Sequence, residues 1–277
     1  MLIRIGYEIV FDSPVPVPMI LMLYTHPSRA GSLKKPDQLK LDPEITVEKF
    51  IDSFGNLCGR IVAPAGRLKL FNEAIVEDSG QLDTVNWNAA QIAVPDLPAE
   101  TIQYLLGSRY CEVDRLSDIA WNLFGQTAPG WARVQAVCDW VHSHIRYGYE
   151  YARSTKTAYD VYTEGTGVCR DFTHLALTFC RCLNIPARYV TGYLGDIGVP
   201  PQPTPMDFHA WFEVFLDGQW YAFDARHNVP RVGRVLIARG RDAVDVALTT
   251  SFGPNTLVEF NVWTDEISEQ ELFVVAS

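Results

Sequence analysis

The stretch that decides the fold is FHAWFEVFLDGQWYAFD, residues 208–224, in which two apolar-rich segments flank an Asp-Gly pair. Asp217-Gly218 between such segments is the signal of a two-residue β-hairpin turn, because both turn positions require a positive φ. In this turn Leu216 faces Gln219, and every other cross-strand pair follows from that one. A slip by one residue would send each side chain to the opposite face of the sheet.

This register predicts that a histidine and a carboxylate meet at the open end of the hairpin. Alternation leaves His209 on the face opposite the expected core face. Asp224 then lies opposite Trp211 and diagonal to His209, about 7–8 Å away between Cα atoms and within reach of a hydrogen bond. Such a carboxylate would hold the ring in one tautomer and stabilise its protonated form. Taken singly, a strand histidine is more often structural, and Asp224 would be interpreted as a turn residue. The expected core face consists of Ala210, Phe212, Val214 and Leu216.

A cysteine stands at the start of a second predicted element. The sequence EGTGVCRDF places Cys169 at the first turn of an amphipathic helix expected at about 168–183. Unpaired helix-start N–H groups and the positive end of the macrodipole favour a thiolate there. Gly165 and Gly167 permit a sharp turn and close approach of a substrate, and the Cys169 N–H is a candidate oxyanion donor. We expect the remaining cysteines to be small buried hydrophobic residues: Cys58, Cys111, Cys138, Cys180 and Cys182.

Together these blocks resemble a known family. GVCRDFTHLALTFCRCLNIPARYVTGY and HAWFEVFLDGQWYAFDAR are similar to the nucleophile, histidine and aspartate blocks of the transglutaminase-like superfamily. IARGRDAVDVALTTSFGPN and LVEFNVWTDE resemble its bacterial branch, and DSFGNLCGRI resembles the N-terminal β-region of that branch. The resemblance implies a papain-like Cys-His-Asp triad, with Cys169 as nucleophile, His209 as general base and acid, and Asp224 as the orienting acid. The reaction would pass through an acyl-enzyme.

Four further residues are weaker candidates for contacts with the substrate or the oxyanion: Gly167, Asp171, Tyr193 and Trp211. Gly167 precedes the nucleophile. Asp171 either meets partners beside Arg170 or complements the helix N-terminus, and we favour the second. Tyr193 and Trp211 line the substrate groove or pack in the core with equal weight. We identify no side-chain oxyanion donor before Cys169. Spacing of the C-x-x-C kind is absent, so we predict no metal and no other cofactor.

The fold class we expect is α+β in two parts. An N-terminal β-sandwich or barrel-like domain covers residues 1–100. A transglutaminase-like, papain-related catalytic domain covers 101–277, with the nucleophile-bearing helix packed on an antiparallel sheet. The division rests on two prolines and a composition shift at 93–110, after which an amphipathic helix is expected at about 130–146. Strands are expected at 2–9, 20–25, 44–52, 58–63, 67–76, 187–193, 208–216, 219–224, 234–238 and 256–263.

Composition excludes several function classes. Of the 277 residues, 48% are hydrophobic and 20% charged, the balance of a globular protein with a core. The net charge of −10, without a basic stripe, argues against nucleic acid as a partner. The chain lacks a long apolar run, and its first residues resemble a strand rather than a signal peptide. We therefore expect a cytoplasmic protein with reduced thiols and no membrane partner.

The leading interpretation is a cysteine protease or amidase that cleaves a peptide or protein amide. Acyl transfer between glutamine and lysine side chains is the second interpretation, and a non-catalytic binding scaffold is the third. Ala225-Arg226-His227-Asn228 follows Asp224 where family blocks often have a Pro-Thr pair, which weakens the analogy to cross-linking enzymes. The Pro- and Gly-rich loop at 195–207 is longer than a simple connector, and such loops are often functional.

Overall fold

The N-terminal strands form two antiparallel sheets because their apolar residues recur with a period of two. The computed structural model describes residues 1–201 and 205–271. One sheet has the order β15-β1-β7-β3, with β4 also paired to β7, and the other has the order β14-β2-β6-β5. Ile3, Ile5, Tyr7 and Ile9 put the buried side of β1 into the core. The strands are β1 (Leu2–Ser13), β2 (Val17–Leu21), β3 (Leu33–Lys35), β4 (Lys40–Asp42), β5 (Glu48–Ile51), β6 (Leu57–Ala63), β7 (Gly66–Glu77), β14 (Thr249–Ser251) and β15 (Thr256–Ile267).

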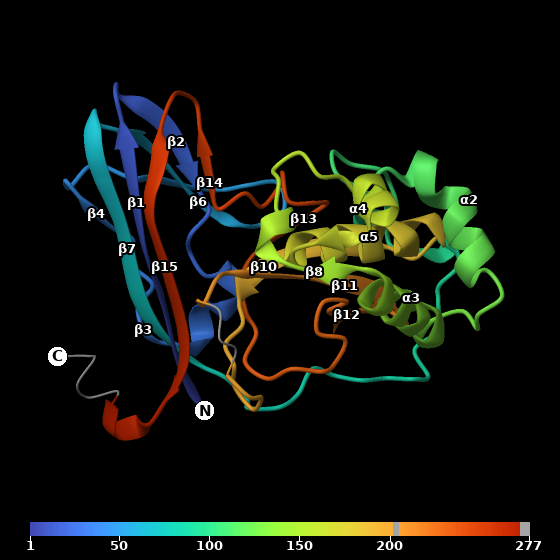
Figure 1. Cartoon of the computed structure of the whole chain (residues 1–277). Helices are drawn as coiled ribbons and strands as arrows, with labels where there is room; N and C mark the ends of the chain where they lie inside the picture. The colour runs from blue at the N-terminus through green and yellow to red at the C-terminus, as the bar shows by residue number, and fades with distance from the viewer. Residues whose placement is uncertain (202–204, 272–277) are drawn as a thin grey trace.

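The end of the chain returns to these N-terminal sheets. β15 runs antiparallel along the whole of β1, from Leu2↔Ile267 to Asp12↔Thr256, and β14 pairs with β2. Figure 1 shows β15, in red, beside β1, in blue. The strand predicted at 256–263 is therefore present, but it belongs to the N-terminal sheet and not with the rest of 101–277. Periodicity predicts a strand and leaves its partner open, whereas the central β1 needs a neighbour on each side for its backbone groups.

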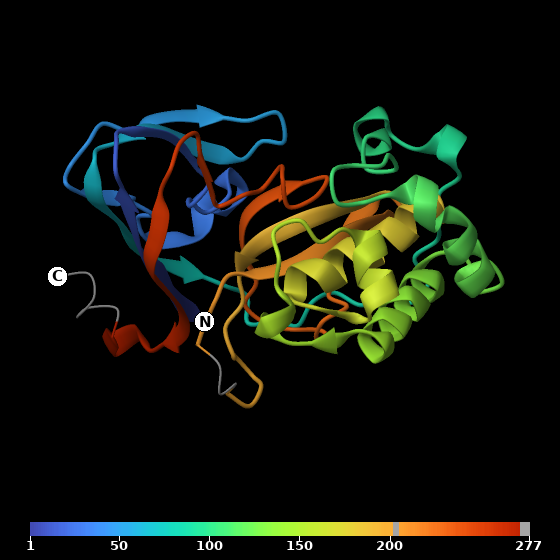
Figure 2. The ribbon, with the colours of Figure 1, turned by 45° about the horizontal axis from the view of Figure 1, so that its top comes forward.

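The second part is a sheet covered by helices on one face. The strand order is β12-β11-β10-β13, and the helix α5 lies across β10 and β11 with α2, α3 and α4 packed around it (Figure 2). The strands of this sheet are β10 (Ala187–Tyr193), β11 (His209–Leu216), β12 (Gln219–Phe223) and β13 (Val235–Gly240), and β8 (Arg146–Tyr147) and β9 (Thr166–Gly167) form a separate parallel pair. The helices are α1 (Ala99–Ile102), α2 (Val113–Phe124), α3 (Trp131–His144), α4 (Ala158–Glu164) and α5 (Cys169–Cys182), with 3₁₀ turns at Pro27–Ser32, Val94–Asp96 and Tyr149–Tyr151.

The predicted hairpin register is confirmed. Leu216 pairs with Gln219 and Phe212 with Phe223. Asp217 and Gly218 have φ of 49° and 82°, as a two-residue turn between twisted strands requires. The helices predicted at about 130–146 and 168–183 are α3 and α5. Sequence reasoning missed α2 and the short α4.

Both faces of β11 are buried, although the alternation predicted a single core face. Trp211 is 2% exposed and Phe215 7%. The core face packs against α5. Over the second face of the hairpin lies the segment after α1, where the ring of Tyr104 packs against Trp220 of β12, and Phe54 from an N-terminal loop packs on Tyr104 in turn. None of the helices in the described part of the chain has the length and apolar character needed to cross a membrane.

Candidate active site

The hairpin brings His209 and Asp224 into direct contact. His209 is the first residue of β11, and Asp224 follows the last residue of β12. The distance between His209 Nε2 and Asp224 Oδ2 is 2.8 Å. The Asp224 side chain is 2% exposed and that of His209 11%. The contact predicted from the register is therefore present, at the edge of the core where the ring still reaches solvent.

Asp224 is surrounded by hydrogen-bond donors. Its Oδ1 accepts the backbone N–H groups of Arg226 and His227, each at 3.1 Å. Its Oδ2 faces His209 Nε2, His227 Nδ1 at 3.1 Å and Arg234 Nη2 at 3.2 Å. Burial by itself would raise the pKa of Asp224, but these donors and charges hold it well below its usual range. The carboxylate is thus ionised and fixed in orientation.

A second imidazole shares this carboxylate. The ring of His227 stacks on that of His209, with centroids 4.8 Å apart and planes at 28°. Sequence reasoning noted His227 only as a departure from the family pattern. The signal that could have found it is its position three residues after Asp224, where a turn returns the side chain to the carboxylate. Asn228 N–H closes that turn on the Asp224 carbonyl at 2.7 Å.

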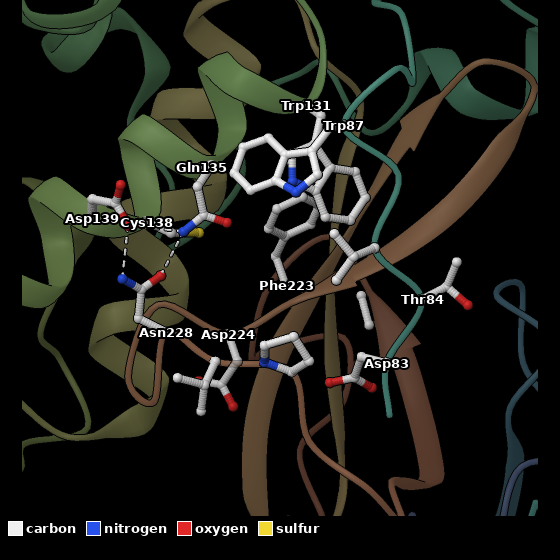
Figure 3. Close-up of a pocket in the computed structure, with 14 residues that line it drawn as sticks. Asp83, Thr84, Trp87, Trp131, Gln135, Cys138, Asp139, Phe223, Asp224 and Asn228 are labelled. Carbon is white, nitrogen blue, oxygen red and sulfur yellow. Dashed lines mark hydrogen bonds between the residues drawn. The ribbon is translucent and has the colours of Figure 1, made fainter. Parts of the chain in front are cut away.

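Helix α3 holds the turn from its other side. Gln135 Nε2 donates to Asn228 Oδ1 at 3.0 Å, and Asn228 Nδ2 donates to Asp139 Oδ1 at 2.8 Å (Figure 3). His142 Nδ1 lies 3.1 Å from the Arg226 carbonyl. These contacts fix residues 224–228 against a rigid element, so the orientation of Asp224 does not depend on a mobile loop.

Cys169 begins α5, as predicted, but its thiol is not electrostatically poised to ionise. Burial raises the pKa of Cys169 to about 12. This value already includes the Ala210 and Arg170 N–H groups, which lower the pKa, and the carboxylates of Asp207 and Asp224, which raise it. Burial therefore outweighs the helix N-terminus that favoured a thiolate, because a charge leaving water costs more than nearby backbone dipoles return.

The imidazole of His209 is also neutral in the free protein. Burial lowers the pKa of His209, and the negative charge of Asp224 offsets only part of that effect. The unliganded site therefore holds a thiol beside a neutral imidazole. Transfer of one proton from Cys169 to His209 would create two opposite charges, and Asp224 is placed to stabilise the imidazolium.

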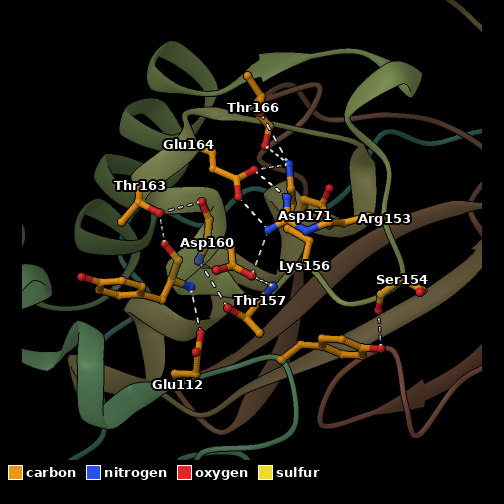
Figure 4. Close-up of polar contacts among 12 residues, drawn as sticks. Glu112, Arg153, Ser154, Lys156, Thr157, Asp160, Thr163, Glu164, Thr166 and Asp171 are labelled. Carbon is orange, nitrogen blue, oxygen red and sulfur yellow. Dashed lines mark hydrogen bonds and ion pairs between the residues drawn. The ribbon is translucent and has the colours of Figure 1, made fainter.

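The approach to Cys169 is braced by a polar network around α4 (Figure 4). Lys156 is 1% exposed, and its Nζ donates to the Thr166 carbonyl at 3.0 Å and pairs with Glu164 at 3.0 Å. Arg153 also pairs with Glu164, at 2.6 Å. Lys156 thereby ties β9 to α4 immediately before Cys169.

The four weaker candidates fall outside the cavity walls. Asp171 is fully buried and accepts the Val168 N–H at 3.0 Å, so it complements the helix N-terminus as favoured. Gly167 has no room for a side chain, since a Cβ there would lie 2.6 Å from Asp171 Cβ. Tyr193 and Trp211 are 0% and 2% exposed. Of the two alternatives for these side chains, the structure shows packing in the core, because elements distant in sequence cover both faces of β10 and β11.

Two cavities adjoin Cys169 and share five lining residues. The larger has a volume of about 460 Å³ and the smaller about 70 Å³. The shared residues are Tyr149, Cys169, Asp207, Phe208 and His209. Part of the predicted functional loop at 195–207, namely 202–204, lies outside the described residues, but Asp207 is described and faces both cavities.

A third cavity lies behind Asp224. Its volume is about 350 Å³, and Trp87, Trp131 and Phe223 are among its walls (Figure 3). Neither Cys169 nor His209 lines it. This space is therefore separate from the two cavities that reach the thiol.

The same cluster offers three atoms that could hold a metal ion. One ligand atom each from His209, Asp224 and His227 lies within 4.8 Å of the others. The Arg234 guanidinium, 3.2 Å from Asp224 Oδ2, opposes a cation at that oxygen, and the same oxygen already accepts from both imidazoles. The donor set fits a hydrogen-bonded carboxylate better than a metal site.

Comparison with known proteins places this arrangement in a family. The model of the transglutaminase-like superfamily matches residues 118–225. The crystal structure of a proposed cysteine protease from Cytophaga hutchinsonii is 32% identical, covers 97% of this chain and 91% of that one, and superposes with a TM-score of 0.84. An uncharacterized protein of Mycobacterium leprae is 27% identical over 209 residues, 72% of this chain and 73% of its own.

The chain therefore belongs to the transglutaminase-like superfamily. Its mixed fold, with antiparallel sheets and a papain-like core, is the one that the sequence resemblance implied. The match to the Cytophaga hutchinsonii structure extends over nearly the whole chain, so it includes the N-terminal sheets. Family and structural neighbour together support an enzyme of the cysteine-hydrolase kind.

Proposed function

We propose that the protein is a cysteine hydrolase that cleaves a peptide or amide bond through Cys169, with His209 and Asp224 completing the triad. The observation that carries the proposal is the 2.8 Å contact between His209 and Asp224 at cavities that also open onto Cys169. The similarity to a proposed cysteine protease over most of both chains supports the same function.

The proposed chemistry depends on which ring nitrogen of His209 is already hydrogen-bonded to Asp224. Nε2 of His209 is committed to Asp224, so Nδ1 is the nitrogen that takes the thiol proton. The Cys169 thiolate then attacks the amide carbonyl carbon, and the electron pair of the C=O bond moves onto its oxygen. Collapse of this tetrahedral species breaks the C–N bond, and the His209 imidazolium protonates the departing amine. Water, deprotonated by His209, hydrolyses the thioester and releases the acid.

The oxyanion is assigned to backbone donors. The first N–H groups of an α-helix have no carbonyl partner inside the helix, and Cys169 is the first residue of α5. Its N–H is therefore available at the reacting centre. The positive end of the helix dipole favours the charge that develops there.

One experiment separates hydrolysis from acyl transfer. The protein is incubated with glutamine-containing peptides and an excess of a primary amine, and products are identified by mass spectrometry. Release of the free acid supports hydrolysis, whereas amine incorporation would replace hydrolysis with the transferase function. Cys169→Ala is the matched control, because it removes the nucleophile with little change of volume.

A second experiment tests the site without a substrate. Iodoacetamide at pH 6 should label Cys169 selectively, since the other cysteines are at most 7% exposed. His209→Ala should slow this labelling strongly, because the thiol then has no base. Equal labelling rates of Cys169 in the parent and in His209→Ala would instead favour a non-catalytic scaffold.

A further inference from the structure

Asp207 places a carboxylate on the walls of both cavities that reach the proposed nucleophile. It precedes β11 by two residues and lines both cavities together with Cys169 and His209. Its charge is close enough to the thiol to raise the pKa of Cys169. The proposed triad chemistry does not use this group, and a negative charge here opposes both the thiolate and the oxyanion.

No positive charge within the described residues compensates Asp207. Its hydrogen-bond donor is the backbone N–H of its own neighbour Phe208, at 2.6 Å. Burial raises the pKa of Asp207, and that N–H is the contact that lowers it. A carboxylate held partly out of water without a counter-ion is costly unless something else approaches it.

The arginines on the cavity walls are occupied elsewhere. Arg170 pairs with Asp171 at 3.2 Å, and Arg153 pairs with Glu164. Arg231 donates to the Gly195 carbonyl at 2.8 Å. The Arg226 guanidinium lies over the Tyr147 ring, 3.8 Å from its centroid. Asp196 adds another carboxylate to the smaller cavity. Among the residues that the structure describes, none therefore supplies a cation facing Asp207.

We propose that Asp207 binds a primary ammonium group of the substrate, carried next to the amide that Cys169 attacks. The inference rests on the proposed hydrolase function and names its substrate class: amides with an adjacent amine, either a free α-amino group or a lysine-like side chain. A carboxylate in the substrate is repelled there, and a neutral substituent leaves the Asp207 carboxylate desolvated and unpaired.

Binding of the ammonium also prepares the nucleophile. The bound cation cancels the negative charge that disfavours the thiolate, so the proton moves more readily from Cys169 to His209. The thiol consequently ionises less readily in the empty site than when the correct substrate is seated. A cationic substrate then gains in the chemical step as well as in binding.

The first test measures the charge beside Cys169 without any substrate. Three alkylating reagents are compared, cationic 2-bromoethylamine, neutral iodoacetamide and anionic iodoacetate, each rate being divided by that of the same reagent with free N-acetylcysteine. We expect the cationic reagent to be favoured over the anionic one by about tenfold or more, and Asp207→Asn to remove most of this ratio. Asp118→Asn, an equal change of charge on the exposed face of α2, is the matched control and should keep it.

The second test identifies the source of the ammonium. Coumarin amides of norleucine, N-acetyl-norleucine and N-acetyl-lysine are compared by kcat/KM. A preference for the first over the second identifies an α-amino group, and a preference for the third over the second identifies a side-chain amine. Asp207→Asn should reduce the preference on the order of tenfold or more.

The outcomes distinguish a failure of the Asp207 assignment from a failure of the proposed hydrolase function on which it rests. If Cys169 is alkylated and amides are cleaved with no cation preference, the Asp207 assignment is wrong and the hydrolase stands. The same conclusion follows if Asp207→Asn leaves the reagent ratio unchanged. If none of the three reagents alkylates Cys169 and none of the amides is cleaved, the activated thiol is refuted, and the substrate assignment falls with it.

Discussion

Replacing Asp224 by Asn tests the site most sharply, because the change preserves shape and removes charge. The Oδ1 position would still accept the N–H groups of Arg226 and His227. At the other position an amide N–H₂ would face three donors, from His209, His227 and Arg234. His209 is then free to adopt the other tautomer, with its proton on Nδ1, the nitrogen needed to receive the thiol proton.

The magnitude follows from these contacts. Breaking a buried charge pair costs about 3–5 kcal/mol. Arg234 keeps its second partner, Asp83, at 2.9 Å, so the low end applies, about 3 kcal/mol. In a chain of this size that lowers the melting temperature by roughly 6–12 °C. Loss of the correct tautomer lowers kcat by roughly 10³–10⁴-fold, as in other triads.

Thermal unfolding followed by circular dichroism gives the first quantity, and peptide hydrolysis or thiol alkylation gives the second. Asp217→Asn is the matched control: it changes the same residue type in the same hairpin, where a positive φ suits asparagine. It should remain within about 0.5 kcal/mol of the parent. A folded Asp224→Asn protein with kcat within about threefold of the parent would refute the orienting role of this carboxylate.

Three further changes have expected outcomes of their own. His227→Ala removes one donor to Asp224 Oδ2 and should lower kcat/KM by roughly two- to tenfold, with His227→Gln, which can still donate, restoring most of it; equal losses in both variants would point to packing instead. His26 is 7% exposed. Burial, followed by the charges of Arg239 and Arg188, lowers its pKa to about 4. As the pH falls below about 6.5, this histidine therefore takes up a proton in the unfolded chain before it does so in the folded protein. Stability should therefore be full above that pH and fall by about 2 kcal/mol between pH 7.5 and 5, and His26→Gln should reduce this loss in urea titrations at the two pH values. Lys156→Met keeps most of the buried volume but releases the Thr166 carbonyl and Glu164, and should cost about 1–3 kcal/mol in the same urea titration; an unchanged midpoint would contradict the bracing role.

The site separates positioning from activation. Asp224 is fixed by backbone donors and by α3, so the orienting carboxylate is fully built before a substrate arrives. The proposed nucleophile is not prepared in the same way, because burial and two carboxylates keep the Cys169 thiol neutral in the free protein. A thiol that stays protonated in the free protein is less open to oxidation and unspecific chemistry, because the thiolate is the reactive form.

Sequence alone was sufficient for the parts of the site that are local. His209 and Asp224 are joined through one tight turn, and the period of two together with an Asp-Gly pair leaves a single register consistent with a buried face. The start of α5 at Cys169 was readable for the same reason, since helix periodicity and the preceding glycines are encoded within a few residues.

The tertiary structure determined the properties that depend on which other segments pack against each helix and strand. The pairing of β15 with β1 joins segments distant along the chain, and the burial of Tyr193 and Trp211 depends on such segments as well. The ionisation of Cys169 belongs to the same group, because it is the surrounding volume, and not the residue's place in a helix, that removes water from the sulfur. Periodicity determines which way a side chain points along its own element, whereas desolvation is a property of everything packed against it.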